Sequence, residues 1–257
     1  MHVTAIVPAA GSGVRFGGVV PKQYLPMAGT PLLAWTLKVL AASGQVDCTI
    51  LAVAAGQEAR CRAEILEPYG LSVDHVLPGG ADRQASVCAG LSRAPADTDL
   101  VLVHDGARPL VTAAIIRAAV EAAGAAGAAV VAVPVTDTIK VADAEYRVEE
   151  TLPRGRLWAA QTPQVFRAAW LREAHATALT DGFRGTDDSV LVERLGYPVR
   201  LVPGSSDNLK ITTVADLAQA EQILRGRMTN DNDQIPMRNR QQAVGHWSLV
   251  IGHWDFP

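Results

Sequence analysis

The chain has 257 residues, of which 49% are hydrophobic and 19% are charged, and its formal net charge at pH 7 is −3. This length and hydrophobic content suit one α/β unit with a sizeable core. The nearly balanced charge excludes a global basic field that would hold nucleic acid or an anionic membrane, so a phosphate ligand must be bound by local cations and backbone N–H groups.

Predicted strands and helices alternate along the first 135 residues. The strands are Val3 to Pro8, Cys48 to Ala54, Val73 to Leu77, Leu100 to His104 and Ala128 to Val135. The helices are Pro31 to Ala42, Gln57 to Tyr69, Asp82 to Arg93 and Thr112 to Ala126, the last with Thr112 as its N-cap. Near-continuous apolar strands separated by helices predict a doubly wound, mostly parallel sheet, which is a Rossmann-like α/β fold.

The pattern changes at Asp137. Residues 137–158 alternate apolar and polar positions between turn residues, which predicts a projecting two-stranded β-arm. Such an arm is unstable alone, so we expect it to pack on a second copy of the chain in a homodimer. Further elements are predicted at Val165 to Leu179 (helix), Asp188 to Leu195 (helix), Val199 to Val202 (strand) and Thr213 to Leu224 (helix).

The domain prediction is one domain over 1–227 followed by a disordered tail over 228–257, because the tail is polar and has no apolar period. The three cysteines form no C-x-x-C pair, so neither a disulfide framework nor a zinc site is expected. The sequence has no basic leader and no apolar run of about 18 residues. These features predict a cytoplasmic protein without a membrane partner.

The segment from Pro8 to Trp35 is the strongest chemical signal. The first strand runs into the small residues Ala9, Ala10 and Gly11, whose backbone can approach phosphates closely. The cations Arg15 and Lys22 follow, which suits a triphosphate and the charge that grows on a phosphorus under attack. A Walker motif is absent, and Phe16 occupies the third glycine position of the dinucleotide fingerprint. A Gly-rich turn with surface cations is the alternative.

Two later motifs also follow predicted strands. Gly79 and Gly80 can admit a flat base close to the backbone, with Arg83 and Ser86 able to hydrogen-bond it, although an ordinary strand–helix turn is an equal alternative. Asp105 follows a buried strand and could hold an acceptor hydroxyl or reach a magnesium shell. In the same motif Arg108 can pair with an anion. His104 is expected to pack or to orient Asp105, with a general base as the alternative.

Seven motifs, in this order, carry a family resemblance: AAGSGVRFGGVVPKQYL, GGADRQAS, VHDGARP, PVTDTIK, LWAAQTPQVF, GTDDS and DNLKIT. Together they closely resemble the 2-C-methyl-D-erythritol 4-phosphate cytidylyltransferases of the non-mevalonate isoprenoid pathway, from about Val3 to Arg225. The sister ribitol-5-phosphate cytidylyltransferases share most of these motifs. One departure is Ala81, where that family often has an acidic residue; this puts a side-chain contact to the base in doubt.

The resemblance implies roles residue by residue. Arg15 and Lys22 match cations that stabilise the α-phosphate in the transition state, and Arg154 and Lys210 match the pair that positions the acceptor phosphate. Acceptor-binding positions are matched by Asp105, Arg108, Thr138 and Thr186. The cytidine pocket is matched by Ala9, Ala10, Gly11, Gly80, Arg83 and Ser86. In the family, the arm residues Thr138 and Arg154 would serve the partner subunit's active site.

The expected activity is transfer of CMP from CTP to 2-C-methyl-D-erythritol 4-phosphate, with Mg²⁺ held mainly by the CTP phosphates. No direct side-chain ligation of the metal is expected, although Asp105 is a possible ligand. The alternatives are the same chemistry on ribitol 5-phosphate or another polyol phosphate, and a non-catalytic nucleotide-binding module or an oxidoreductase. Two cations in the first loop, Arg15 and Lys22, argue against the last two.

Overall fold

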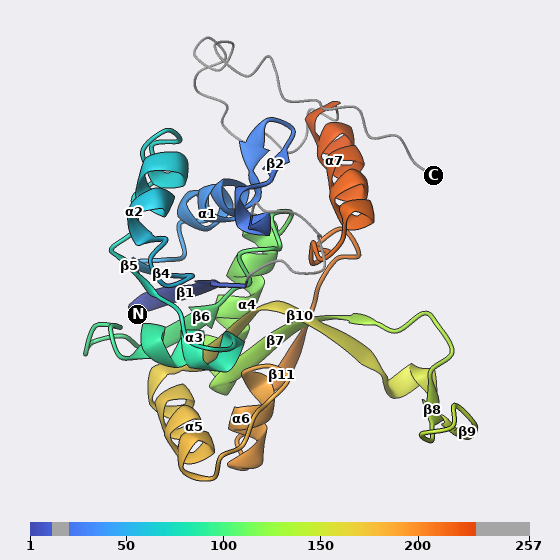
Figure 1. Ribbon diagram of the computed structural model, residues 1–257. Helices are drawn as coiled ribbons and strands as arrows, with labels where there is room; N and C mark the ends of the chain where they lie inside the picture. Colours follow the sequence, from blue (N-terminus) through green and yellow to red (C-terminus); the bar gives the residue numbers. More distant parts are fainter. Residues whose placement is uncertain (12–20, 230–257) are drawn as a thin grey trace.

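The computed structural model describes residues 1–11 and 21–229 (Figure 1). The central sheet has seven strands, in the spatial order β11 (Arg200–Pro203), β7 (Ala128–Pro134), β10 (Trp158–Arg167), β6 (Leu100–Val103), β1 (Val3–Ala9), β4 (Cys48–Val53) and β5 (His75–Pro78). Neighbouring strands are parallel except at β10, which runs antiparallel to both β6 and β7. The predicted mostly parallel α/β sheet is confirmed.

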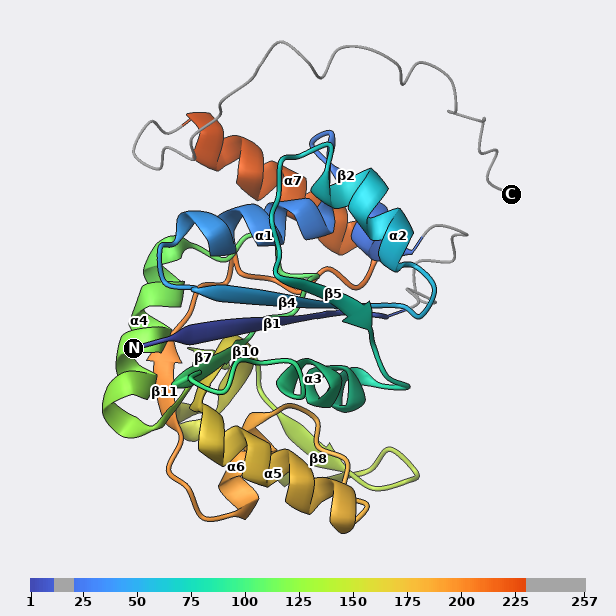
Figure 2. The same ribbon diagram turned by 90° about the vertical axis from the view of Figure 1, so that its left-hand side faces the viewer.

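Helices cover both faces of the sheet (Figure 2). One face carries α1 (Leu32–Ala42), α2 (Glu58–Cys61), which continues into η3 (Arg62–Leu66), α4 (Ala113–Ala126) and α7 (Val214–Thr229). The other face carries α3 (Arg83–Leu91), α5 (Ala168–Thr180) and α6 (Ser189–Arg194). Successive β1 residues point to opposite faces of the sheet. Ala5 and Val7 therefore pack in the apolar core under α1 and α4, and Ile6 packs in the core under α3 and α5.

Local sequence chemistry sets the ends of α4. The Thr112 hydroxyl accepts a hydrogen bond from the Ile115 N–H at 3.3 Å, as its predicted N-cap role requires. At the other end, Gly127 has a φ of +92°, which ends the helix in the left-handed region. A Cβ at Gly127 would also lie 2.2 Å from the Trp170 ring, so only glycine fits there.

The predicted helix from Val165 to Leu179 is wrong at its beginning. Residues up to Arg167 belong to β10, and α5 begins at Ala168. Val165 and Phe166 are buried on opposite faces of the sheet, which is the two-residue period of a strand rather than a helix. Pro163 donates no ladder hydrogen bond, and the β10–β7 register shifts between Ala160 and Gln164, so the strand tolerates it at an irregularity.

The predicted β-arm is present between β7 and β10, and its paired strands occupy only part of it. Its hairpin pairs β8 (Lys140–Ala142) with β9 (Val148–Thr151), followed by the single turn η4 (Arg154–Arg156). Trp158 already pairs with β7 in the central sheet. A second small pair, β2 (Pro26–Met27) with β3 (Thr30–Pro31), lies in the first motif after the turn η2 (Lys22–Tyr24) and was not predicted.

Two predictions reach beyond the described residues. Arg15 lies in 12–20, and most of the predicted tail lies in 230–257; both segments are outside the part that the structure describes. The beginning of that tail, at Met228, is still helical as the end of α7. Among the described helices, none combines the length and the apolar character that a membrane span requires.

Candidate active site

A cavity of about 400 Å³ lies at the carboxyl ends of β1, β5 and β6. Ligands of parallel α/β sheets bind at this edge. The predicted site residues that line it are Ala9, Ala10, Gly11, Lys22, Gly80, Arg83, Ser86, Asp105 and Lys210. Four segments that are far apart in the sequence therefore meet in one cavity; three of them follow predicted strands, and the fourth carries Lys210.

Close packing requires the two glycines after β5. A Cβ at Gly79 would lie 2.5 Å from the Ala10 Cβ and 2.8 Å from the Ser86 Oγ, and one at Gly80 would lie 2.3 Å from the Ala85 Cβ. The glycines thus let this loop approach the end of β1 and the start of α3. The packing of the protein itself therefore explains why both positions are glycine, whether or not a base binds there.

The Ser86 hydroxyl holds this loop together. It donates to the Asp82 carbonyl at 2.8 Å and accepts from the Gly80 N–H at 3.1 Å. Its one hydrogen is therefore already used, and toward a ligand Ser86 can act only as an acceptor. The Asp82 side chain caps α3 by accepting from the Ala85 N–H at 2.8 Å.

Asp105 is the centre of the cavity's charge. Its Oδ1 accepts from Arg83 Nε at 2.8 Å, its Oδ2 pairs with Lys210 Nζ at 2.7 Å, and Arg108 Nε lies 3.9 Å from Oδ2. Burial alone would raise the pKa of Asp105, but Arg83 and Lys210 hold that pKa well below its usual range. The carboxylate is therefore ionised at neutral pH and orients two cations.

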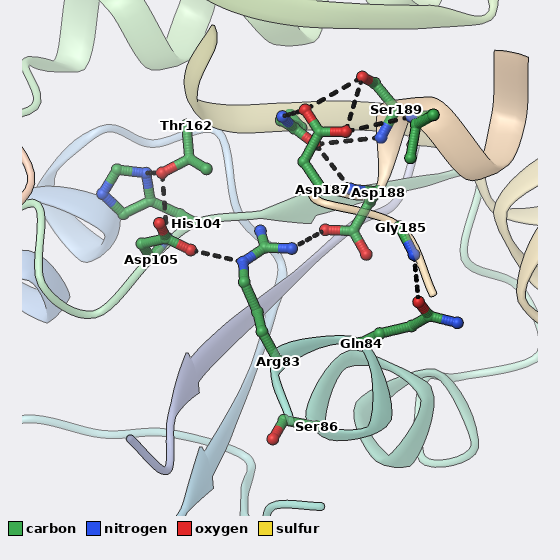
Figure 3. Close-up of polar contacts among 12 residues, drawn as sticks. Arg83, Gln84, Ser86, His104, Asp105, Thr162, Gly185, Asp187, Asp188 and Ser189 are labelled. Atoms are coloured by element: carbon green, nitrogen blue, oxygen red, sulfur yellow. Dashed lines mark hydrogen bonds and ion pairs between the residues drawn. The ribbon is translucent and has the colours of Figure 1, made fainter. Parts of the chain in front are cut away.

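A buried hydrogen-bond chain orients Asp105 from behind, through Thr162 and His104 (Figure 3). The Arg108 carbonyl can only accept, so His104 Nε2, 3.1 Å away, carries the ring hydrogen. Burial lowers the pKa of His104 to about 4, so the ring is neutral and its Nδ1 accepts from the Thr162 hydroxyl at 3.0 Å. That hydroxyl in turn accepts from the Asp105 N–H at 3.0 Å. His104 is fully buried and orients Asp105, as expected, so a general-base role does not fit.

The segment that carries Lys210 is tied to the same region. The fully buried Asn208 donates from its amide to the Gln161 Oε1 at 3.1 Å and to the Thr162 carbonyl at 2.9 Å. The backbone carbonyl of Asn208 accepts from Arg108 Nη1 at 2.6 Å. Arg108 is thus held beside Asp105, just behind the residues that line the cavity. Lys22 Nζ donates to the Ile211 carbonyl at 3.1 Å, so the first motif meets the last one here.

Four of the predicted residues that the structure describes do not line this cavity: Arg108, which lies just behind it, and Thr138, Arg154 and Thr186. Thr138 and Arg154 belong to the arm, which projects away from the body (Figure 1), and Arg154 donates to the Thr136 carbonyl at 2.9 Å. Thr186 is exposed on the segment between α5 and α6. The single chain therefore brings together the predicted nucleotide residues and part of the acceptor residues, and it leaves the arm residues apart.

Sequence reasoning missed three buried site residues, Thr162, Asp188 and Asn208. All three stand inside the family motifs, but the resemblance assigns roles only to Thr186, near Asp188, and to Lys210, near Asn208. Asp188 pairs with Arg83 Nη1 at 2.6 Å. An acidic residue at the start of a short helix is usually a cap, so no local signal distinguished Asp188 before the tertiary contact was seen.

A protein-bound metal does not fit the described side chains. Within residues 1–11 and 21–229, no group of three His, Cys, Asp or Glu side chains could hold a metal ion. Both Asp105 oxygens are engaged by Arg83 and Lys210, so direct coordination by Asp105 would require the loss of an ion pair.

The comparisons with known proteins agree on one family. The family model described as 2-C-methyl-D-erythritol 4-phosphate cytidylyltransferase matches residues 3–226. A protein of that name from Pelotomaculum thermopropionicum is 46% identical over 226 residues, covering 88% of this chain and 95% of the relative. The crystal structure of a 4-diphosphocytidyl-2C-methyl-D-erythritol synthase from Anaerococcus prevotii is similar with a TM-score of 0.77 at 30% identity, covering 87% of this chain and 98% of that one. The cytidylyltransferase structure from Thermus thermophilus has a TM-score of 0.73 at 40% identity, covering 88% and 100%.

Proposed function

The chain belongs to the 2-C-methyl-D-erythritol 4-phosphate cytidylyltransferase family, and from this premise we propose that it transfers CMP from CTP to 2-C-methyl-D-erythritol 4-phosphate and releases pyrophosphate. The observation that supports the proposal within the structure is the cavity at the sheet edge, where Arg83 and Lys210 pair with the ionised Asp105 and Lys22 lines the same cavity. Two anionic substrates can be brought together only where cations offset their repulsion. We also propose a cytoplasmic location for this activity.

The proposed step is one in-line displacement. An oxygen of the acceptor phosphate forms a bond to the α-phosphorus of CTP, and the bond from that phosphorus to the bridging oxygen of the β-phosphate breaks. Pyrophosphate leaves with the electron pair. The attacking oxygen is already anionic at neutral pH, so no general base is required, and none is needed from the buried, neutral His104.

In this proposal, some cations bind CTP and others bind the acceptor phosphate. Lys22 lines the cavity at the end of the first motif and would stabilise the charge that grows on the α-phosphate, together with Arg15. Lys210 lies on the opposite segment and would position the acceptor phosphate. Lys210 is paired with Asp105 in the structure, so binding of the acceptor would exchange a carboxylate partner for a phosphate.

The nucleotide would lie against the small residues after β1 and the glycine loop after β5. Ala9, Ala10, Gly11 and Gly80 leave backbone groups accessible at the cavity wall. The remaining acceptor capacity of the Ser86 hydroxyl suits an amino group, which cytosine has and uracil lacks. Ala81 supplies no polar side chain to the base. Magnesium is proposed to enter with CTP, bound to its phosphate oxygens and water.

The acceptor site is proposed to be completed by a partner subunit. Asp105, Arg108 and Thr186 would bind the polyol on one chain, and Thr138 and Arg154 would reach it from the arm of the other. Apolar side chains on and beside the arm are exposed in the single chain, which supports an interface there: Val141, Tyr146, Val148 and Trp158. A two-fold homodimer would make the exchange reciprocal.

The direct test is a pyrophosphate-release assay with purified protein and magnesium. CTP with 2-C-methyl-D-erythritol 4-phosphate should give turnover, and ATP, GTP or UTP with the same acceptor should give far less. Ribitol 5-phosphate in place of the methylated acceptor tests the sister activity. Turnover only with ribitol 5-phosphate, or equal use of ATP and CTP, would overturn the proposal.

A further inference from the structure

A carboxylate behind the cavity holds a side chain of the cavity wall. Asp188 lies just before α6 and is fully buried, and it is not part of the cavity lining. Its Oδ2 accepts from Arg83 Nη1 at 2.6 Å, and its Oδ1 accepts from His175 Nε2 at 3.1 Å. The backbone N–H of Asp188 donates to the Gln164 Oε1 at 3.2 Å, which fixes the carboxylate against β10.

The guanidinium of Arg83 is held on two of its three nitrogens. Nε donates to Asp105 at 2.8 Å and Nη1 donates to Asp188, so the planar group is clamped between two carboxylates (Figure 3). Its third nitrogen, Nη2, is buried and has no hydrogen-bond partner among the described residues. Because the fork is rigid, fixing two nitrogens also fixes the direction of the third.

We propose that Asp188 and His175 are positioning residues that hold the Arg83 guanidinium at its place in the cavity wall, where it contacts bound CTP. The inference rests on the proposed cytidylyl transfer and adds two residues that lie outside the cavity. Arg83 lines the cavity beside Ser86 and Gly80, on the side proposed for the nucleotide.

Asp188 also prevents Arg83 from pairing with Asp105 alone. Without a second carboxylate, the guanidinium could pair with Asp105 through two nitrogens, which is the preferred geometry of an arginine and a carboxylate. Such a pair would compete with Lys210 for Asp105 and would move the guanidinium from its present place in the cavity wall. The two-carboxylate arrangement separates the roles, with Asp188 binding only Arg83 and Asp105 remaining shared with Lys210.

His175 supports Asp188 from α5. An ionised carboxylate can only accept hydrogen bonds, so His175 Nε2 carries the hydrogen that it donates to Oδ1. His175 is 3% exposed, and its position on α5 is set by packing against the core under the sheet. The direction of Arg83 therefore depends on a helix whose side chains do not line the cavity.

The experiment measures CTP binding by titration calorimetry, together with steady-state kinetics and the melting temperature. Asp188→Asn keeps the shape and one acceptor for Arg83 and removes the charge. We expect CTP to bind on the order of tenfold more weakly, since hydrogen bonds lose about half their strength when a charge is removed. The KM for the acceptor should change less than the KM for CTP. His175→Leu should weaken CTP binding in the same direction, and His175→Gln, which keeps an N–H donor, should restore part of it.

The matched control is Asp187→Asn. Asp187 makes the same kind of local contacts at the start of α6, to Gln164, Ser189 and Val190, but it does not contact Arg83. CTP affinity in this variant should stay within about twofold of the wild type, even if the melting temperature falls. Equal losses of CTP affinity in Asp187→Asn and Asp188→Asn would indicate a structural effect of the loop and overturn the inference.

A double-mutant cycle isolates the path through Arg83. In an Arg83→Met background, Asp188→Asn should cause no further loss of CTP affinity, because the side chain that Asp188 positions is gone. Independent losses that multiply would mean that Asp188 acts elsewhere. A wild-type protein that binds CTP and turns over, beside an unaffected Asp188→Asn variant, would refute this inference alone. A wild-type protein that does not bind CTP would refute the proposed function, and the inference with it.

Discussion

At the scale of single residues, the candidate site is organised by one carboxylate and the groups around it. The Asp105 carboxylate pairs with Arg83 and Lys210 at the cavity. On the opposite side, the Asp105 backbone N–H donates to the Thr162 hydroxyl. Its low pKa follows from this surrounding, because burial alone would have the opposite effect. The cations are therefore held in place before substrates arrive, which reduces the cost of organising them during the reaction.

Lys22→Met should lower kcat by about a hundredfold or more, because the proposed role of Lys22 is to stabilise charge that appears only in the transition state. Steady-state kinetics with saturating CTP and acceptor provide the measurement. Lys38→Met is the control: Lys38 lies over the Trp35 and Tyr69 rings, away from the cavity, and its loss should leave kcat within about twofold. Near-normal turnover of Lys22→Met would contradict the proposed mechanism.

Thr162→Val should destabilise the protein by about 1–3 kcal/mol, since it leaves the buried Asp105 N–H and His104 Nδ1 without a partner while keeping the side-chain shape. Thr162→Ser retains the hydroxyl and should lose less than half as much. Urea unfolding of both variants tests this. Equal losses would show that the methyl group of Thr162, rather than its hydroxyl, matters for stability.

At the scale of elements, the nucleotide side of the cavity depends on how closely the β5–α3 loop approaches β1. Gly79 and Gly80 allow this approach, and Ser86 and Asp82 hold the loop from within. The unpredicted antiparallel strand β10 has a similar role on the other side. It brings Thr162 to the end of β6 and places Gln164 against Asp188.

Gly79→Ala should be strongly destabilising and should weaken CTP binding, because its Cβ would lie 2.5 Å from the Ala10 Cβ, where neither backbone has room to move cheaply. Gly226→Ala in α7 is the contrasting control. Its Cβ would meet nothing within 4 Å, and alanine favours a helix over glycine by about 1 kcal/mol. Thermal unfolding should therefore shift in opposite directions for the two variants, and a shift in the same direction would contradict the packing argument.

At the scale of the whole molecule, two properties follow from groups that span distant segments. One is the pH dependence of stability, to which His104 contributes because its ring is buried between the Arg108 carbonyl of its own segment and Thr162 of β10. The other is the assembly of the acceptor site, because the arm that carries Thr138 and Arg154 extends away from its own cavity.

Stability should fall as the pH is lowered from about 6.5 to about 4. In this window the unfolded His104 takes up a proton while the folded ring, with its pKa lowered to about 4 by burial, stays neutral. The unfolded state then binds more protons, so the free energy of unfolding rises with pH and falls on acidification. Asp105 acts in the same direction, but only below its ordinary pKa of 3.8. The free energy of unfolding, measured with urea between pH 7 and 4.5, should depend less steeply on pH in His104→Gln than in the wild type. Identical pH dependences would exclude His104 as the cause.

Mixing Arg154→Ala with Lys22→Ala should restore activity if each active site contains the arm of the partner. Both homodimers should be nearly inactive, whereas a mixed dimer has one complete site. Random assembly makes half of the dimers mixed, so recovery should reach up to about a quarter of the wild-type activity. Absence of recovery after verified subunit exchange would mean that the arm acts within its own chain.

Local patterns in the sequence determined most of the sheet and the placement of the cavity. Apolar strand runs, the Thr112 cap and the small residues after β1 all act over a few neighbouring positions, so they are readable without a structure. Tertiary structure alone decided that residues 165–167 complete a strand, since Val165 and Phe166 are held by two neighbouring strands rather than by a helical period. It also decided that Asp188 faces Arg83, a contact between residues 105 positions apart for which neither residue carries a local signal. Local periodicity predicts elements, whereas ion pairs across the sheet edge depend on how those elements pack.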